Sequence, residues 1–149
     1  MAIVRTAGTE IIRSAHFETV DDDQTVLIQG VQHHIYTVLS VICNGQSMAS
    51  VGNYIRLMII GYDSLAGTTA QEMIIFKQDM NTDQTYVWND KFSFNGYEPT
   101  DFAGPMDDAT KQDAIADQGS SVAQKLVIHA ENSSDNVDVH VTYIDQNNS

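Results

Sequence analysis

The stretch Val137-Asp138-Val139-His140-Val141-Thr142-Tyr143 alternates apolar and polar side chains without a break. Since successive side chains of a β-strand point to opposite faces, this pattern predicts a strand with one buried face and one face in water. The rest of the chain repeats the signal, as β-branched and aromatic runs broken by clusters of Gly, Asn and Asp. The eight expected strands cover residues 9–17, 24–29, 33–43, 53–62, 70–78, 84–95, 122–130 and 136–144.

These signals predict an all-β fold: an antiparallel β-sandwich, jelly-roll-like, with about eight strands and one long loop at 97–121. A chain of 149 residues fits a single domain, 1–149, and 42% hydrophobic residues suffice for a core. Residues 1–17 are either a contact arm or the first strand. The 97–121 loop contains both prolines, and a short helix could start at 107–113 within it. Loops of this length commonly make contacts, so it is a candidate partner surface.

The last two strands are expected to form a hairpin that residues 133–136 close. If Ala130 pairs with Val137, then His129 faces Asp138 across the two strands, and His140 lies opposite Val127 on the same face. Asn44-Gly45 and Asn95-Gly96 are expected to supply further turns. In the 84–95 run, an aromatic stripe shares one face and is expected to lie in the core: Tyr86, Trp88, Phe92 and Phe94.

Two runs, Ile35 to Cys43 and Tyr54 to Tyr62, are apolar at nearly every position. A strand with two apolar faces needs a second cover, from a loop or from a neighbouring subunit. A neighbouring copy would also protect edge strands, so we expect a homo-oligomer, with a trimer favoured. Cys43 is the one cysteine, which excludes an intramolecular disulfide, and we expect a buried, inert thiol.

The net charge of the chain excludes some classes of binding partner. Twenty acidic and seven basic residues give a formal net charge of −13. Such a surface repels phosphate backbones and anionic membranes, so we expect no nucleic-acid and no membrane partner. Residues 1–6 lack the apolar region of a signal peptide, and no apolar run approaches the roughly 18 residues that span a bilayer. We therefore expect synthesis in the cytoplasm without export.

None of the candidate sites in the sequence has a complete set of metal ligands or catalytic residues. His33 and His34 cannot chelate one ion on a strand, because neighbouring side chains point to opposite faces. A His129–Asp138 pair would only orient an imidazole, since no nucleophile is placed beside it. The run Gly45-Gln46-Ser47-Met48-Ala49 departs from the G-x-S-x-G nucleophile elbow. We expect no enzyme, no catalytic residue, no cofactor and no tightly bound metal.

Acidic clusters leave calcium open as an alternative to a solvated acidic surface. Asp21-Asp22-Asp23 lacks the spacing and the terminal Glu of an EF-hand loop. The same holds for a second group in the long loop: Asp107, Asp108, Asp113 and Asp117.

The C-terminal half of the chain resembles small β-sandwich virion proteins of tailed bacteriophages, the group that includes capsid decoration (cement) proteins and some neck or fibre components. The resemblance rests on the runs Gln84–Phe92, Lys125–Ala130 and Val137–Asp145. It implies a virion structural protein that binds the major capsid protein on the outer capsid surface and stabilises the shell. The 97–121 loop departs from the short connection typical of that group. Segments 1–17 and 97–121 are the expected contacts with neighbouring coat subunits, and the acidic surface suits the outside of a shell packed with DNA.

Three alternatives remain open at this point. A neck, tail or fibre component would share most of these features. A carbohydrate- or ligand-binding sandwich would expose aromatics beside polar groups, and Tyr54, Tyr62 or Tyr97 could serve. A cupin-type enzyme would need several histidines converging inside the barrel, which the His33-His34 pair does not favour.

Overall fold

The computed structural model describes residues 9–31, 34–62, 71–96 and 122–147. The regular elements in these ranges are nine strands: β1 Thr9–Val20, β2 Thr25–Gln29, β3 His34–Ser47, β4 Tyr54–Tyr62, β5 Gln71–Asp79, β6 Thr85–Trp88, β7 Phe92–Asn95, β8 Val122–Ala130 and β9 Asn136–Asn147. The expected residues 107–113 helix and the rest of the 97–121 loop lie outside the described residues, as do residues 1–8. Residues 9–17 belong to β1, so this part of the expected 1–17 arm is the first strand.

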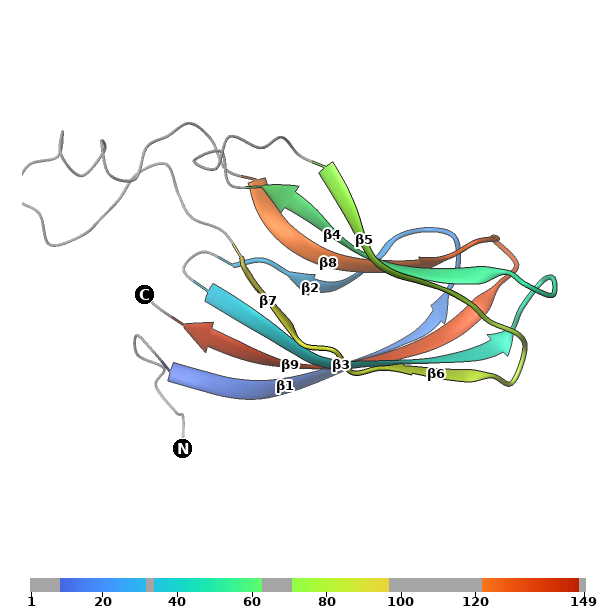
Figure 1. The fold of residues 1–149 in the computed structure, drawn as a ribbon, viewed down its shortest axis with the longest axis horizontal. Coiled ribbons are helices and arrows are strands. Elements are labelled where there is room, and N and C mark those ends of the chain that lie inside the picture. Colours follow the sequence, from blue (N-terminus) through green and yellow to red (C-terminus); the bar gives the residue numbers. More distant parts are fainter. Residues whose placement is uncertain (1–8, 32–33, 63–70, 97–121, 148–149) are drawn as a thin grey trace, which may run out of the picture.

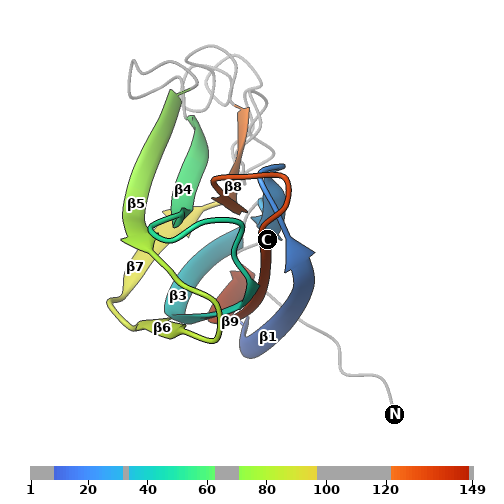
Figure 2. The same cartoon turned by 90° about the vertical axis from the view of Figure 1, so that its right-hand side faces the viewer.

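The strands form two antiparallel sheets that face each other as layers of a sandwich (Figures 1 and 2). Sheet A has the order β1-β9-β3-β6, with β7 also paired to β3, and sheet B has the order β2-β8-β4-β5. The pairing is nested: β1 pairs with β9, β2 with β8, β3 with β6 and β7, and β4 with β5. This winding of a chain between two sheets is a jelly roll, so the expected fold class is confirmed.

The core lies between the sheets and is built from the alternating strand positions. In β9, Val137, Val139 and Val141 are at most 1% exposed, while the residues between them face outward. The opposite sheet contributes Ile55, Leu57 and further aliphatic side chains to the same cluster. The aromatic stripe packs against this core as expected: Tyr86, Trp88, Phe92 and Phe94 belong to it or border it.

The 84–95 run is two strands, not one. Residues 89–91 separate β6 from β7, and both strands pair with β3. Asn89, Asp90 and Lys91 are polar and exposed, so the ladder is interrupted where the side chains favour water.

The expected hairpin between the last two strands is wrong. β8 pairs with β2 and β4 in sheet B, whereas β9 pairs with β1 and β3 in sheet A. The segment 131–135 carries the chain from one sheet to the other. Its Asp135 is 2% exposed, and the carboxylate accepts hydrogen bonds from the amides of Ala49 and Asn132. These bonds fix the segment in a path that leads from sheet B to sheet A. In a tight hairpin, β8 and β9 would instead pair with each other in one sheet.

Asn44-Gly45 is not a turn but an interior part of β3, where Gly45 pairs with Val137. The Gly45 amide donates to Gln84 O (2.9 Å), and Gly45 O accepts from the Asp83 amide (2.7 Å). A Cβ on Gly45 would lie 2.8 Å from Asn81 O, so glycine is needed for this close approach rather than for a reversal of the chain.

The two faces of β4 are both covered within the single chain. Leu57 lies in the core at 0% exposure, and Met58, which points to the other face, is 1% exposed. Met58 pairs with Val127 of β8, which is also fully buried. β4 therefore needs no neighbouring subunit to cover it, although in β3 the outward-facing Ile42 remains 37% exposed.

Candidate functional site

The four histidines that the structure describes do not converge inside the sandwich. His16 and His140 lie on the outer face of sheet A, His129 lies in β8 beside Arg56, and His34 begins β3. His33 lies outside the described residues. The positions that point between the sheets are largely aliphatic or aromatic. The four described histidines are thus placed unlike the ligand set of a cupin, and His140 pairs with His16 and Ile42 instead of facing Val127.

A cluster of polar contacts around the buried Asp145 carboxylate lies at the end of the sandwich where β1 and β3 begin and β9 ends. The Asp145 side chain is 7% exposed; its Oδ1 lies 2.6 Å from His34 Nδ1, and its Oδ2 accepts from Arg13 Nε at 3.0 Å. A carboxylate removed from water is stable only when charge and hydrogen bonds compensate it, and these contacts do so. The cluster ties three strands of sheet A together.

Two tyrosines share this environment. Burial, with a further contribution from the Asp145 charge, raises the pKa of Tyr36 to about 12. The pKa of Tyr143 is also raised, chiefly by burial. The Tyr36 hydroxyl accepts from the Val31 amide at 3.1 Å and so links sheet A to the residues after β2. The neutral phenols and the hydrogen-bonded carboxylate indicate that this polar cluster has a structural role at the end of the sandwich where β1 and β3 begin.

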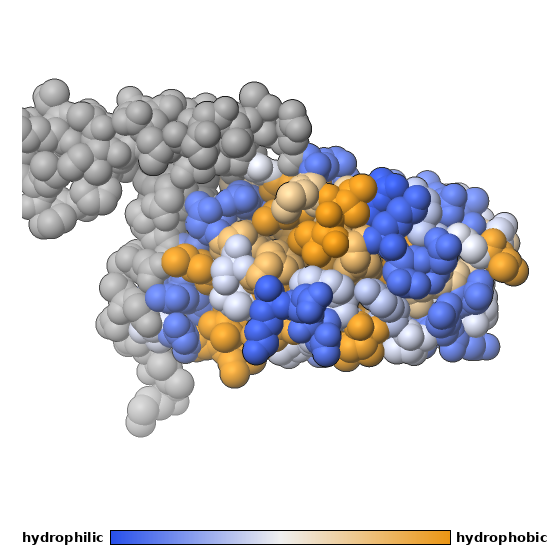
Figure 3. Space-filling model, in the orientation of Figure 1, coloured by the Kyte–Doolittle hydropathy of each residue, from blue (hydrophilic) through white to orange (hydrophobic). Residues whose placement is uncertain are grey.

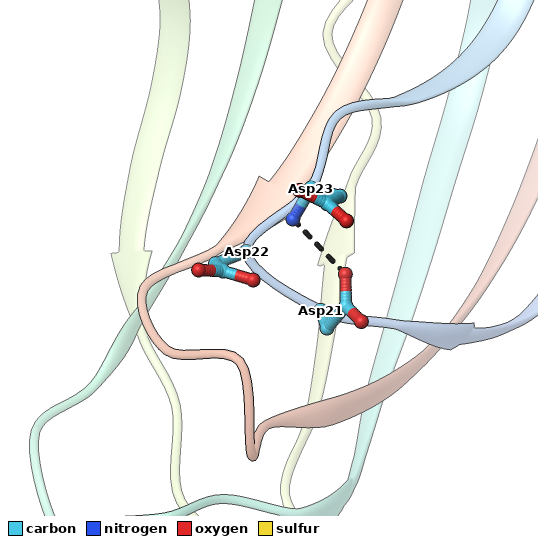
Figure 4. A group of neighbouring side chains, drawn as sticks. All are labelled: Asp21, Asp22 and Asp23. Atoms are coloured by element: carbon cyan, nitrogen blue, oxygen red, sulfur yellow. Dashed lines mark hydrogen bonds between the residues drawn. The ribbon is translucent and has the colours of Figure 1, made fainter.

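The Asp21-Asp22-Asp23 turn brings three carboxylates within 4.8 Å of one another (Figure 4). The Asp23 amide donates to Asp21 Oδ1 at 3.0 Å, and Asp21 O accepts from the Ala130 amide at 2.7 Å. These bonds explain the turn without an ion, and calcium takes six to eight oxygen ligands. The second acidic group, in the 97–121 loop, lies outside the described residues.

Ser47 and Cys43 do not form a nucleophilic site. Ser47 ends β3 in register with Asn136, away from any strand-to-helix elbow. Cys43 is fully buried, and burial raises its thiol pKa to about 12. The expected burial of Cys43 is confirmed, and since a thiolate is the reactive form, an inert thiol stays the prediction.

Tyr54, a candidate for stacking on a sugar, is engaged by cations of its own chain. Lys77 Nζ lies 4.2 Å and Arg56 Cζ lies 4.8 Å from its ring centroid. The His129 ring approaches it edge-on at 6.4 Å. The Lys77 and Arg56 contacts are cation–π interactions, so the Tyr54 ring already has cationic partners within its own chain. The Tyr62 side chain and Tyr97 lie outside the described residues.

The outer face of sheet A carries rows of cross-strand partners that contain few charges. One row runs from His16 through His140 and Ile42 to Val87, across β1, β9, β3 and β6. A second row joins Ile12, which is 71% exposed, to Ile144. In a chain of net charge −13, this face is a place where another macromolecule can approach without strong repulsion.

Apolar side chains also gather where β5 and the β6–β7 pair form sheet edges (Figure 3). Met73 and Ile74 on β5 are 63% and 48% exposed, and Val87 on β6 is 54% exposed. Between the two edges, Trp88 contacts Phe76 at 6.1 Å and Phe92 at 5.5 Å between ring centroids. We call Met73 and Ile74 the apolar edge, and Val87 belongs to the outer row of sheet A. An unpaired edge strand with exposed apolar side chains is a surface on which another chain can pack.

No protein-family model and no curated protein sequence matches this chain. Similar solved structures include a subunit of Bacillus endospore appendages, a family of disulfide-linked pili (9% identity, TM-score 0.43, covering 100% of this chain and 97% of that one). A chain of infectious bursal disease virus, Gx strain, is also similar (9% identity, TM-score 0.43, 92% of this chain and 32% of that one). So is a chain of the T13 particle of the same virus (9% identity, TM-score 0.39, 99% and 37%).

The described chain spans about a third of the length of the two virus chains. Identities of 9% and TM-scores of 0.43 or less carry no functional assignment. Among the residues that the structure places, no helix has the length and apolar character to cross a membrane.

The outer face of sheet A brings together two short patterns, one on β1 and one on β9. His16 and Glu18 share a face of β1, and Asp138 and His140 share a face of β9, as the i, i+2 spacing allows. These His-x-Glu and Asp-x-His patterns are visible in the sequence. Their juxtaposition depends on the pairing of β1 with β9, which local sequence patterns do not report.

Proposed function

We propose that this chain is a bacteriophage virion structural protein, a decoration (cement) protein that binds the outer capsid surface and stabilises the shell. The observation that carries the proposal is the distribution of side chains in the jelly roll. Its interior positions are filled by aliphatic and aromatic residues, and large apolar side chains are exposed on the outer strand surfaces. A protein built in this way works through contacts with other macromolecules. Jelly rolls serve this purpose in viral capsids.

The net charge of −13 supports a position on the outside of the particle. An acidic protein gains nothing from the inner wall, which faces DNA of the same sign. Modest contacts repeated over a capsid lattice stabilise the shell through avidity, without requiring a strong single interface. A neck, tail or fibre position is the alternative within the same class.

A mass-spectrometric inventory of the purified virion tests the proposal. The expected result is this chain in a copy number that matches the capsid lattice, together with the major capsid protein. A copy number that matches the few copies of a neck or tail component would contradict decoration, and absence of the chain from the particle would contradict a virion role altogether.

The other proposed partner is the chain itself, in a trimer. The support is the apolar edge, where an unpaired strand exposes Met73 and Ile74. In a shared interface, Ile74→Lys would place a charge against apolar surface and should reduce the mass measured by light scattering from three chains to one, 16.5 kDa. Val51→Lys is the matched control, because Val51 is 93% exposed in the turn before β4. A wild-type monomer at micromolar concentration would refute the oligomer.

A further inference from the structure

We propose that His16, His140 and Glu18 form a binding site for a divalent transition-metal ion on the outer face of sheet A. The site is independent of the proposed virion role. It would be an exchangeable surface site rather than a tightly bound cofactor.

The two imidazoles lie close to the separation that chelation requires. His16 and His140 are direct cross-strand partners in the β1–β9 ladder, and their ring centroids are 6.0 Å apart at an interplanar angle of 47°. With metal–nitrogen bonds of about 2.0–2.1 Å, two imidazoles on one ion have ring centroids about 5 to 6 Å apart. Small side-chain rotations therefore bring one nitrogen of each ring to a common ion. The His16 side chain is 53% exposed, so solvent and ions reach the site.

A carboxylate stands beside His16. Glu18 Oε1 lies 3.6 Å from His16 Nε2, and two ligand atoms on one tetrahedral ion are about 3.3 Å apart. The backbone contributes to this placement. β1 has a β-bulge here: Glu18 and Thr19 together lie opposite Asp138, between the pairs Phe17–Val139 and Val20–Val137. Thr19 has a φ of 58°, a conformation that β-branched residues seldom adopt.

The ligand set determines the class of ion. Two imidazoles and one carboxylate suit Zn²⁺, Cu²⁺ and Ni²⁺, and leave positions for water or for a group from another molecule. Cu²⁺ should bind most tightly, in keeping with the Irving–Williams order. Mg²⁺, which prefers an all-oxygen octahedral shell, should not compete.

Isothermal titration of the untagged full chain with CuCl₂, NiCl₂ and ZnCl₂ tests the proposal. We expect one exchangeable site per chain that contains both histidines. Both His16→Gln and His140→Gln should weaken the affinity at least about tenfold, because each removes the second, intramolecular ligand. Glu18→Gln should have a smaller effect. The matched control is His129→Gln, since His129 is also a strand histidine but lies in the other sheet, beside Arg56.

A spectroscopic readout separates ligation from a change in folding. Electron paramagnetic resonance of the Cu²⁺ complex should show two nitrogen ligands in the wild type and one in either histidine variant, each variant having an unchanged circular-dichroism spectrum. Three results would overturn the proposal: no binding below millimolar concentrations, equal affinities in the wild type and both variants, or a loss with His129→Gln as large as the loss with His16→Gln.

Discussion

Replacing Asp135 by alanine should destabilise the fold more than any surface change of similar size, because this buried carboxylate holds the crossover between the sheets. It accepts from the Ala49 amide at 2.7 Å, from the Asn132 amide at 3.0 Å, and from Asn53 Nδ2 at 3.0 and 3.2 Å. Hydrogen bonds to a charged group contribute about 1.5 to 3 kcal/mol each. Ala49 and Asn132 are exposed residues, so water recovers part of the loss.

The Asn53 side chain, on a residue only 8% exposed, would be left without its acceptor. We therefore expect Asp135→Ala to lower the free energy of unfolding by about 3 to 5 kcal/mol. Asp135→Asn keeps one acceptor oxygen and should cost about 2 kcal/mol. Urea denaturation followed by Trp88 fluorescence, at one fixed protein concentration, measures both values.

Asp22→Ala is the matched control, since Asp22 is an exposed aspartate in a turn. It should change the free energy of unfolding by no more than about 0.5 kcal/mol. A loss below about 1 kcal/mol for Asp135→Ala would refute the reasoning, because the carboxylate would then not hold the crossover.

Three further outcomes follow from single residues. Thr19→Asn should raise the free energy of unfolding by about 0.5 to 1 kcal/mol, since Asn tolerates the left-handed conformation of Thr19 (φ 58°); an unchanged or lower value in urea denaturation would count against strain there. Cys43 should not react with Ellman's reagent in the native protein near pH 8 but should react fully in guanidinium, and rapid native labelling would show that its burial is wrong. Stability should fall as the pH rises from 10.0 to about 12, because the Tyr36 phenol ionises in the unfolded chain first; Tyr36→Phe should lessen this fall, and an equal fall in both proteins would contradict the raised pKa.

Local patterns predicted the strands well, and they failed where the partner of a strand had to be known. The alternation in Val137–Tyr143 fixes which face of β9 is buried, and the structure agrees. The same alternation does not say whether β9 pairs with β8 or with β1, because both pairings bury the same side chains. The crossover depends on Asp135 contacting Ala49, a tertiary contact that no local sequence pattern reports.

The candidate metal site could not be predicted either, because it depends on which strands pair. The five histidines could be counted from the sequence, but their grouping required the ladder. The expected hairpin placed His140 opposite Val127, and it gave no information on which strand lies on the other side of β9. The register of β1 against β9 instead sets the two imidazoles side by side.

The coverage of β4 also depends on tertiary contacts, and the sequence left a loop of the same chain and a neighbouring subunit as alternatives. Two apolar faces suggested a neighbouring subunit, yet Met58 is 1% exposed in the single chain. Sheet B is curved so that side chains from its two edge regions meet, with Gln24 Nε2 donating to Glu72 Oε1 at 3.3 Å. The surface that remains for assembly is therefore the apolar edge and the outer face of sheet A.

Cryo-electron microscopy of the intact virion tests the central claim most directly. A decoration protein predicts density for the jelly roll on the outer capsid surface, repeated with the symmetry of the lattice and contacting neighbouring coat subunits. Density for this chain only at the neck, tail or fibres, or no density anywhere on the particle, would contradict it.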